Sequence, residues 1–199
     1  MTAQLEKSLR NQIMETNFDL FFKKLTNLIM KDGKKIKASK ILFKTLIILK
    51  QKLKKDLEKN MFLSKSKDLE HNFLEKSTVK STSQLRNLKT DSLDFLLFSL
   101  LSQAVENVTP NLEVRKVRVA GSTYLVPAVL SKKKQETLAL KWLLESAQKR
   151  QKNSKLDFST CLADEILDAS RKIGQARQKR DELHRLAQTN RAYIRYRWW

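Results

Sequence analysis

Residues 112–126 read LEVRKVRVAGSTYLV and are the one stretch of this 199-residue chain with the composition of β-structure. Valine, threonine and tyrosine favour strands, and the Ala-Gly-Ser step at residues 120–122 is typical of a tight turn between two strands. The first arm carries the cations Arg115, Lys116 and Arg118. Because an isolated two-stranded ribbon is marginal in water, this hairpin must pack on its surroundings or bind something anionic.

The rest of the chain has helical periodicity and only three glycines and two prolines, which predicts a mainly α fold. Helices are expected at about 18–29, 36–53, from Asp91 or Ser92 to Pro110, from Ser131 past Arg150, at 158–173 with Gly174 as the C-terminal stop, and at 177–195. Residues 54–90 lack this pattern and are expected to form a mobile insert or an irregular loop.

The net charge of the chain indicates which class of molecule it binds. The chain has 41 lysines and arginines against 21 acidic residues, a formal net charge of +20. Such an excess is best neutralised by a polyanion, and nucleic acid is the first candidate, with an anionic membrane surface as the competing explanation. Ten of the twelve arginines follow Pro110. Because guanidinium groups bind phosphate in bidentate geometry, specific contacts are expected in this later half.

The last expected helix combines a cationic face with an apolar face. At 100° per residue, Arg177, Arg180, His184, Arg191 and Arg195 fall within about a 60° arc beside an apolar face. This stripe is either a nucleic-acid contact or a solvated helix face. The aromatic residues near the end of the chain could pack in the core, stack on bases or contact a protein, and packing is the more common role.

No residues with the spacing of a catalytic, metal or cofactor site are found. Cys161 lies on an apolar helical face, where a small buried thiol is expected, and His71 and His184 do not have metal-ligand spacing. The turn at residues 31–35, KDGKK, lacks the long glycine-rich loop of a phosphate-binding motif and predicts a helix–helix turn with exposed lysines. No apolar run approaches the ~18 residues that span a bilayer, and residues 1–7 lack a signal-peptide core.

Five segments, taken in order, resemble the small-subunit ribosomal protein seven family in its bacterial and organellar form. They are MKDGKK at 30–35, AVENV at 104–108, GSTY at 121–124 followed by Val126 and Pro127, LALKWL at 138–143, and KRDE at 179–182 with HR at 184–185 through YRW at 196–198. The resemblance covers about residues 17–53 and 91–198. It implies a single domain at 18–199, interrupted by the insert at about 54–90 and preceded by a divergent segment at 1–17.

The resemblance implies a bundle of about six helices with a protruding β-hairpin arm, and a structural protein without enzymatic activity. It implies binding to the 3′ major (head) domain of small-subunit rRNA, nucleation of head assembly, and an arm directed towards exit-site tRNA and mRNA. It also implies contacts with neighbouring small-subunit proteins, notably the eleventh. The rRNA contacts that it implies are Lys34, Lys35, Arg115, Lys116, Arg118, Lys179, Arg180 and Arg185.

To these contacts the basic helix faces add Arg150, Arg177, Arg191 and Arg195, and the hairpin tip is expected at Ala120, Gly121, Ser122 and Tyr124. The chain departs from the family pattern at the tip and at residues 1–17, which replace a basic tail. Its Lys, Asn, Ile and Phe content, the insert and the lack of a transit peptide favour a mitochondrial ribosomal protein encoded in the organelle; a plastid or the bacterial cytoplasm is the alternative location. The competing function is a basic architectural nucleic-acid-binding protein outside the ribosome, which would not prefer structured RNA over duplex.

Overall fold

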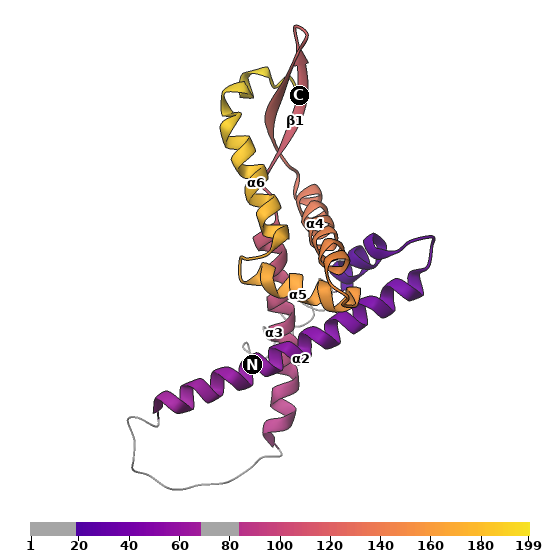
Figure 1. Ribbon diagram of the computed structural model, residues 1–199, viewed down its shortest axis with the longest axis vertical. Helices are drawn as coiled ribbons and strands as arrows, with labels where there is room; N and C mark the ends of the chain where they lie inside the picture. Colours follow the sequence, from indigo (N-terminus) through magenta and orange to yellow (C-terminus); the bar gives the residue numbers. More distant parts are fainter. Residues whose placement is uncertain (1–18, 69–83) are drawn as a thin grey trace, which may run out of the picture.

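The computed structural model describes residues 19–68 and 84–199 (Figure 1). Over these residues the chain forms six α-helices, a 3-10 helix and a two-stranded hairpin. In chain order they are a helix at residues 19–29, α2 Lys35–Asp68, α3 Gln84–Val108, β1 Leu112–Val119, β2 Ser122–Val129, α4 Lys132–Asn153, α5 Phe158–Ser170, α6 Gln175–Thr189 and η1 Arg191–Tyr196. The expected helical fold with a hairpin arm is therefore confirmed.

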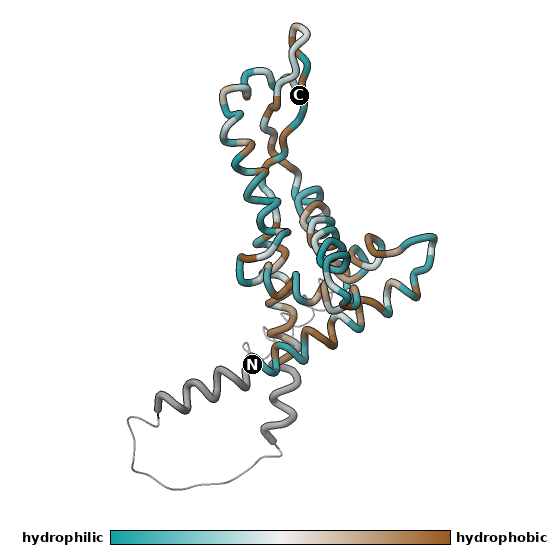
Figure 2. Tube along the Cα trace, viewed as in Figure 1, coloured by the Kyte–Doolittle hydropathy of each residue, from teal (hydrophilic) through white to brown (hydrophobic). Residues whose placement is uncertain are grey.

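α5 is the centre of the packing. It contacts α2, α3, α4 and α6, and its residues Cys161, Leu162, Ile166 and Ala169 are all buried. Cys161 is therefore the small buried thiol that its position predicts. In Figure 2 hydrophobic residues are frequent where α2 and α3 cross beneath α5 and along parts of the hairpin, whereas α6 is largely hydrophilic. Burial of these apolar side chains, at about 25 cal/mol per Å², is the main force that holds the helices together.

The prediction of a loop over residues 54–90 is wrong at both ends of this range. α2 continues to Asp68 and α3 already begins at Gln84, so neither Asp91 nor Ser92 is an N-cap. The physical reason is that Lys, Glu, Gln and Leu are good helix formers even without an apolar period, and neither Gly nor Pro occurs between Gly33 and Pro110. Residues 69–83 with His71, and the segment at 1–17, lie outside the described residues.

Gly174 does not end α5. That helix ends at Ser170, Lys172 takes the left-handed conformation with φ 62°, and Ile173 is 64% exposed instead of buried. Gly174, with φ 101°, is the N-cap of α6. A Cβ at this position would lie 3.1 Å from both Asp168 Cβ and Glu165 Oε1. Both the backbone angle and the lack of space therefore require glycine here.

The expected helix at 177–195 is shorter than predicted. α6 ends at Thr189, Asn190 is its C-cap, and the chain tightens into η1. Arg191 and Arg195 are therefore not on the same helical face as Arg177 and Arg180, and the single cationic stripe is broken after α6. Asn190 explains the break because its side-chain amide donates to the Leu186 carbonyl (2.8 Å) and so competes with the next helical turn.

The hairpin protrudes from one end of the molecule, with α6 beside it (Figure 1). β1 and β2 are antiparallel, and Val119 pairs with Ser122 across the two-residue loop Ala120-Gly121. Both loop residues have positive φ, 48° and 83°, which is the I′ turn that matches the twist of the strands. β2 continues past Pro127 to Val129. Counting back from the turn, Pro127 occupies a non-hydrogen-bonded pair, where its missing N–H costs nothing.

Candidate nucleic-acid interface

One face of the hairpin presents cations to the surroundings. Lys116 pairs with Leu125 and Arg118 with Thr123, so these four side chains share one face of the ribbon. Lys116 and Arg118 are exposed, and neither has an ion pair with another described residue. This face can therefore bind an anion without first giving up an internal partner.

The opposite face holds the arm against η1. Tyr124 packs against Tyr193 and Tyr196 with ring centroids 5.0 Å apart in each pair, and Val126 is completely buried. Tyr124 is therefore not a tip residue, in contrast to Ala120, Gly121 and Ser122, which are exposed around the loop. Aromatic pairs of this kind contribute about 0.5–1.5 kcal/mol beyond burial. The tyrosines pack, which was the more common of the expected roles.

Arg115 lies at the edge of the hairpin face that packs against η1. Its Nε donates to Glu113 (2.5 Å), and its guanidinium lies 5.2 Å from the ring centroid of Trp199. Of the three cations on β1, Arg115 therefore contributes to the attachment of the C-terminus, while Lys116 and Arg118 point to the other side.

Two arginines of α6 close the end of α3. Arg177 (2.8 Å) and Arg180 (2.7 Å) both donate to the carbonyl of Asn107, in the last turn of α3. That carbonyl has no helical partner, and a positive charge is favourable at the C-terminus of a helix. Burial, followed by the nearby charge of Arg177, lowers the pKa of Arg180 below its usual value, and the charge of Asp181 offsets part of this. Both side chains are only 21% exposed, so this part of the expected stripe faces the protein.

His184 fixes the root of the hairpin. The backbone N–H of Asn111, one residue before β1, donates to its Nε2 (3.3 Å). Burial, followed by the positive charge of Arg180, lowers the pKa of His184 below its usual value, and the charge of Asp181 offsets only part of this. The imidazole is therefore neutral at neutral pH, with its free nitrogen accepting the Asn111 hydrogen bond.

Arg150 and Lys179 form ion pairs with acidic side chains of neighbouring helices. Arg150 donates to Glu165 (2.9 Å) and Asp168 (2.5 Å) of α5, and Lys179 forms an ion pair with Glu145 of α4. Burial alone would lower the pKa of Arg150, but the hydrogen bond to Asp168 and the charges of Glu165 and Asp168 raise it above its usual value. Glu165 is completely buried, and its other oxygen accepts from the Ala176 N–H (2.9 Å). This network joins α4, α5 and α6.

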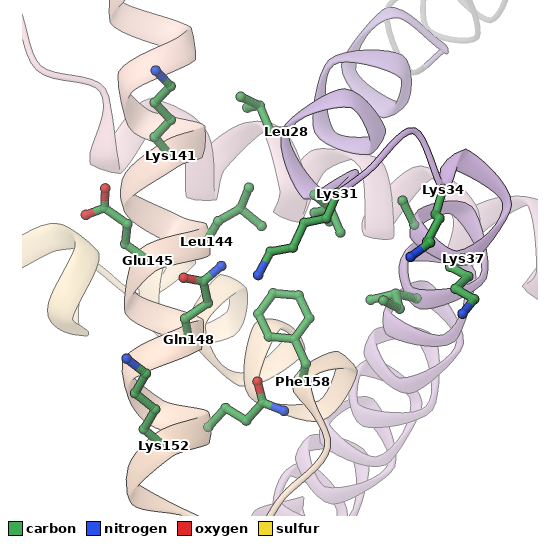
Figure 3. A pocket seen from close by; sticks show the side chains of 14 residues that line it. Leu28, Lys31, Lys34, Lys37, Lys141, Leu144, Glu145, Gln148, Lys152 and Phe158 are labelled. Carbon is green, nitrogen blue, oxygen red and sulfur yellow. The ribbon is translucent and has the colours of Figure 1, made fainter.

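A second basic surface is a groove of about 640 Å³ between α4 and the start of α2 (Figure 3). Its lysines are Lys31, Lys34 and Lys37 on one wall and Lys141 and Lys152 on the other. Among the described lining residues Glu145 is the one acid, and Lys179 pairs with it. Among the described acids, Lys34 contacts Asp32 alone, at 3.4 Å, and Lys35 is exposed nearby. The groove is therefore strongly positive.

The floor of this groove is apolar. Leu28, Leu144 and Phe158 line it, and Figure 3 shows the Phe158 ring between the two walls with Gln148 opposite. A site with cationic walls and an aromatic floor can hold phosphates at its rim and a base at its centre. The groove thus has the chemistry of a nucleic-acid contact.

Of the five groove lysines, only Lys34 was among the RNA contacts expected from the sequence; Lys31, Lys37, Lys141 and Lys152 were missed. The signal was present: Lys31, Lys34 and Lys37 recur every third residue, and Lys141 and Lys152 are three helical turns apart on one face of α4. What the sequence does not show is that α5 holds these two segments opposite each other.

The remaining expected cations lie near the C-terminus. Arg185, Arg191 and Arg195 are exposed, and the Arg195 guanidinium lies 5.2 Å from the Tyr196 ring centroid. Arg191 lines a hollow of about 450 Å³ at the root of the hairpin, together with Ile194 and Arg197. These side chains extend the positive surface from the arm towards α6.

The described residues contain no group of three or more His, Cys, Asp or Glu side chains arranged to hold a metal ion. Within residues 19–68 and 84–199, no helix is both long and apolar enough to span a membrane. What the described surface offers is fixed positive charge, which binds and orients a polyanion.

Known proteins similar to this chain are ribosomal. The family described as Ribosomal protein S7p/S5e matches residues 3–191. Small ribosomal subunit protein uS7m of Prototheca wickerhamii is 46% identical over 196 residues, with 88% of each chain covered. Protein uS7m of Marchantia polymorpha is 52% identical over 104 residues, which are 52% of this chain and 45% of the relative. Protein uS7 of Mycoplasmopsis synoviae is 34% identical over 175 residues, 88% of this chain and 85% of its own.

The relatives designated uS7m are mitochondrial members of the small ribosomal subunit, and the expected location in the mitochondrial ribosome is confirmed by them. The match over most of the chain confirms the resemblance that the five sequence segments indicated. By its family match and its relatives, the chain belongs to the ribosomal protein S7p/S5e family.

Proposed function

We propose that the chain binds the 3′ major (head) domain of small-subunit rRNA, nucleates assembly of the head, and extends its hairpin towards exit-site tRNA and mRNA. Family membership makes it a structural constituent of the small ribosomal subunit, in a family that is not enzymatic. The observation that supports the finer proposal is the presence of two exposed cationic surfaces, the groove and the hairpin face, on one packed scaffold.

The distribution of acids explains why these surfaces remain positive. Acidic side chains of α4, of α5 and of the α5 N-cap pair with cations of other helices, as in Glu136 with Lys24 (2.5 Å), Asp164 with Lys52, and Asp157 with Lys44 (2.5 Å). These exposed or half-exposed pairs each contribute little to stability. Their larger effect is on charge placement, because acids that pair between helices leave the groove and the hairpin face uncompensated.

The two surfaces suit different tasks. The groove is formed by the end of the helix at residues 19–29, the turn that follows it, α2, α4 and α5, so its lysines keep a fixed register and can recognise the shape of a folded RNA. The hairpin projects from the helices, with its root fixed by His184 and its outer half held against η1 by Tyr124. An arm of this kind reaches a ligand beyond the rRNA domain, and we assign it to exit-site tRNA and mRNA. Neighbouring small-subunit proteins, notably the eleventh, complete the proposed set of partners.

Fluorescence anisotropy with the chain's own 3′ major domain RNA tests the proposal. The RNA association constant K falls as salt is added, and each lost phosphate contact reduces the magnitude of the slope of log K against the logarithm of salt concentration by about 0.7–0.9. Replacing Lys37 and Lys141 by Gln should reduce the slope by about 1.5 in total, and Lys155→Gln, an exposed lysine outside both surfaces, should leave it unchanged. Equal affinity for random duplex DNA would instead support the architectural nucleic-acid-binding alternative.

A further inference from the structure

α2 has apolar side chains on two opposite faces. The inner face carries Ala38, Leu42 and Leu49, which are buried against the other helices. On the outer side, Ile36 is 76% exposed, Phe43 57% and Ile47 58%. At 100° per residue, these three residues lie within a ~40° arc on the side of the helix away from the core. We call Ile36, Phe43 and Ile47 the outer stripe.

The outer stripe is not a typical solvated helix surface. A helix that packs on one side normally turns polar residues to water on the other, whereas a helix that is apolar on both sides is covered on both. The Phe43 ring packs against Phe22 with centroids 5.2 Å apart, so the stripe continues onto the neighbouring helix at residues 19–29. From Ile36 to Ile47 it runs about 16 Å along α2.

Charge around the stripe indicates the chemistry of its occupant. Lys40 lies beside the stripe and Lys54 continues its line along α2, and within the described part of the chain neither has an ion pair. The occupant should therefore be apolar with acidic flanks. A second copy of this chain fits poorly because each copy carries a net charge of +20. RNA would satisfy the lysines but would leave the aliphatic side chains of Ile36 and Ile47 without a matching apolar partner.

We propose that the outer stripe docks a neighbouring protein of the small ribosomal subunit, through a segment with apolar side chains flanked by Asp or Glu. This inference rests on the proposed ribosomal function and names a surface for one of its protein partners. Three side chains bury far less surface than the roughly 800 Å² that each partner buries in a stable binary complex. The contact therefore forms within the assembled subunit, where RNA already brings the two proteins together.

The test is photo-crosslinking in purified small subunits. A photoreactive amino acid is placed at Ile47, and in a matched variant at Ile173, an isoleucine of similar exposure (64%) in the loop between α5 and α6. We expect the Ile47 variant to give a covalent adduct to a peptide of another protein that contains apolar and acidic residues, and the Ile173 variant to lack this adduct. Adducts only to RNA, to a second copy, to another part of the same chain, or none at all would overturn the proposal.

A second measurement examines the charge argument. With the crosslinker at Ile36, Ile47→Glu should lower the adduct yield at least tenfold, because it adds a negative charge beside an acidic partner, whereas Ile173→Glu should not change it. An unchanged yield with Ile47→Glu would contradict the acidic character of the partner. Incorporation of the chain into small subunits is measured separately. A chain that is absent from subunits refutes the proposed function, while a chain that is incorporated but forms no protein adduct refutes only the docking surface.

Discussion

Replacing Gly174 by Ala should destabilise the fold by about 4 kcal/mol. A non-glycine residue at φ 101° carries backbone strain of roughly 1–3 kcal/mol. The new Cβ would also stand 3.1 Å from Glu165 Oε1, which accepts from the Ala176 N–H at 2.9 Å. Moving that buried carboxylate weakens the bond, and an unsatisfied buried group costs about 1–3 kcal/mol. The two effects act at the same point, the junction of α5 and α6.

Gly33→Ala provides the matched control. Gly33 also has a positive φ, 71°, but a Cβ there meets nothing within 4 Å. It should therefore cost only the left-handed backbone strain, about 1–2 kcal/mol. Urea unfolding of the full chain, followed by far-UV circular dichroism, gives the free energy of unfolding of each variant. If Gly174→Ala is no more destabilising than Gly33→Ala, the contact of Glu165 with the start of α6 does not hold this junction.

The other predictions concern the arm, its root and the buried ion network. Lys116→Gln and Arg118→Gln together should lower the salt slope of RNA binding by about 1.5 without changing the circular dichroism spectrum, while Lys155→Gln changes neither; an unaltered slope would remove the hairpin face from the interface. Folding lowers the pKa of His184, so its contribution to stability is present above its unfolded pKa of about 6.5 and is lost as pH falls below that value. Urea midpoints measured from pH 8 to pH 5 should show this loss in the wild type and a weaker one in His184→Gln, and parallel profiles would contradict it. Arg150→Met should cost about 2–4 kcal/mol, because it leaves a fully buried carboxylate without its cation, and a loss under 1 kcal/mol would show that the network is not stabilising.

The hairpin was predictable because its information is local. The β-branched run, the Ala120-Gly121 step and the alternating cations all lie within one stretch, and the register follows from the turn. The expected β-stretch ended at Val126, before Pro127, yet in a two-stranded ribbon every strand is an edge and tolerates proline at a non-hydrogen-bonded position. The strand therefore continues three residues further, to Val129, and the predicted element itself is confirmed.

The helix boundaries were harder to predict because their causes are not in the apolar pattern. α2 runs on through a polar segment that has helix-forming residues and no breaker. Gly174 has the sequence context of a C-terminal stop, and only its contacts with Glu165 and Asp168 show that it starts the next helix. The acidic network of α5 was likewise invisible to periodicity, since Glu165 lies on a face that is otherwise apolar.

Three arginines of the helices and the lysines of the groove have different roles, which charge counting does not reveal. The concentration of arginine after Pro110 suggested that this half makes the specific RNA contacts, yet Arg150, Arg177 and Arg180 bind carboxylates and a helix-end carbonyl inside the protein. A guanidinium has several donors in a rigid plane and remains charged when partly buried, so it suits these internal positions. The groove, by contrast, is lined by lysines, whose flexible stems keep the charge in water beside a ligand. Arg150, Arg177 and Arg180 thus hold the helices and the hairpin root in place, and this fixed framework gives the exposed groove lysines the defined spacing that the proposed RNA binding requires.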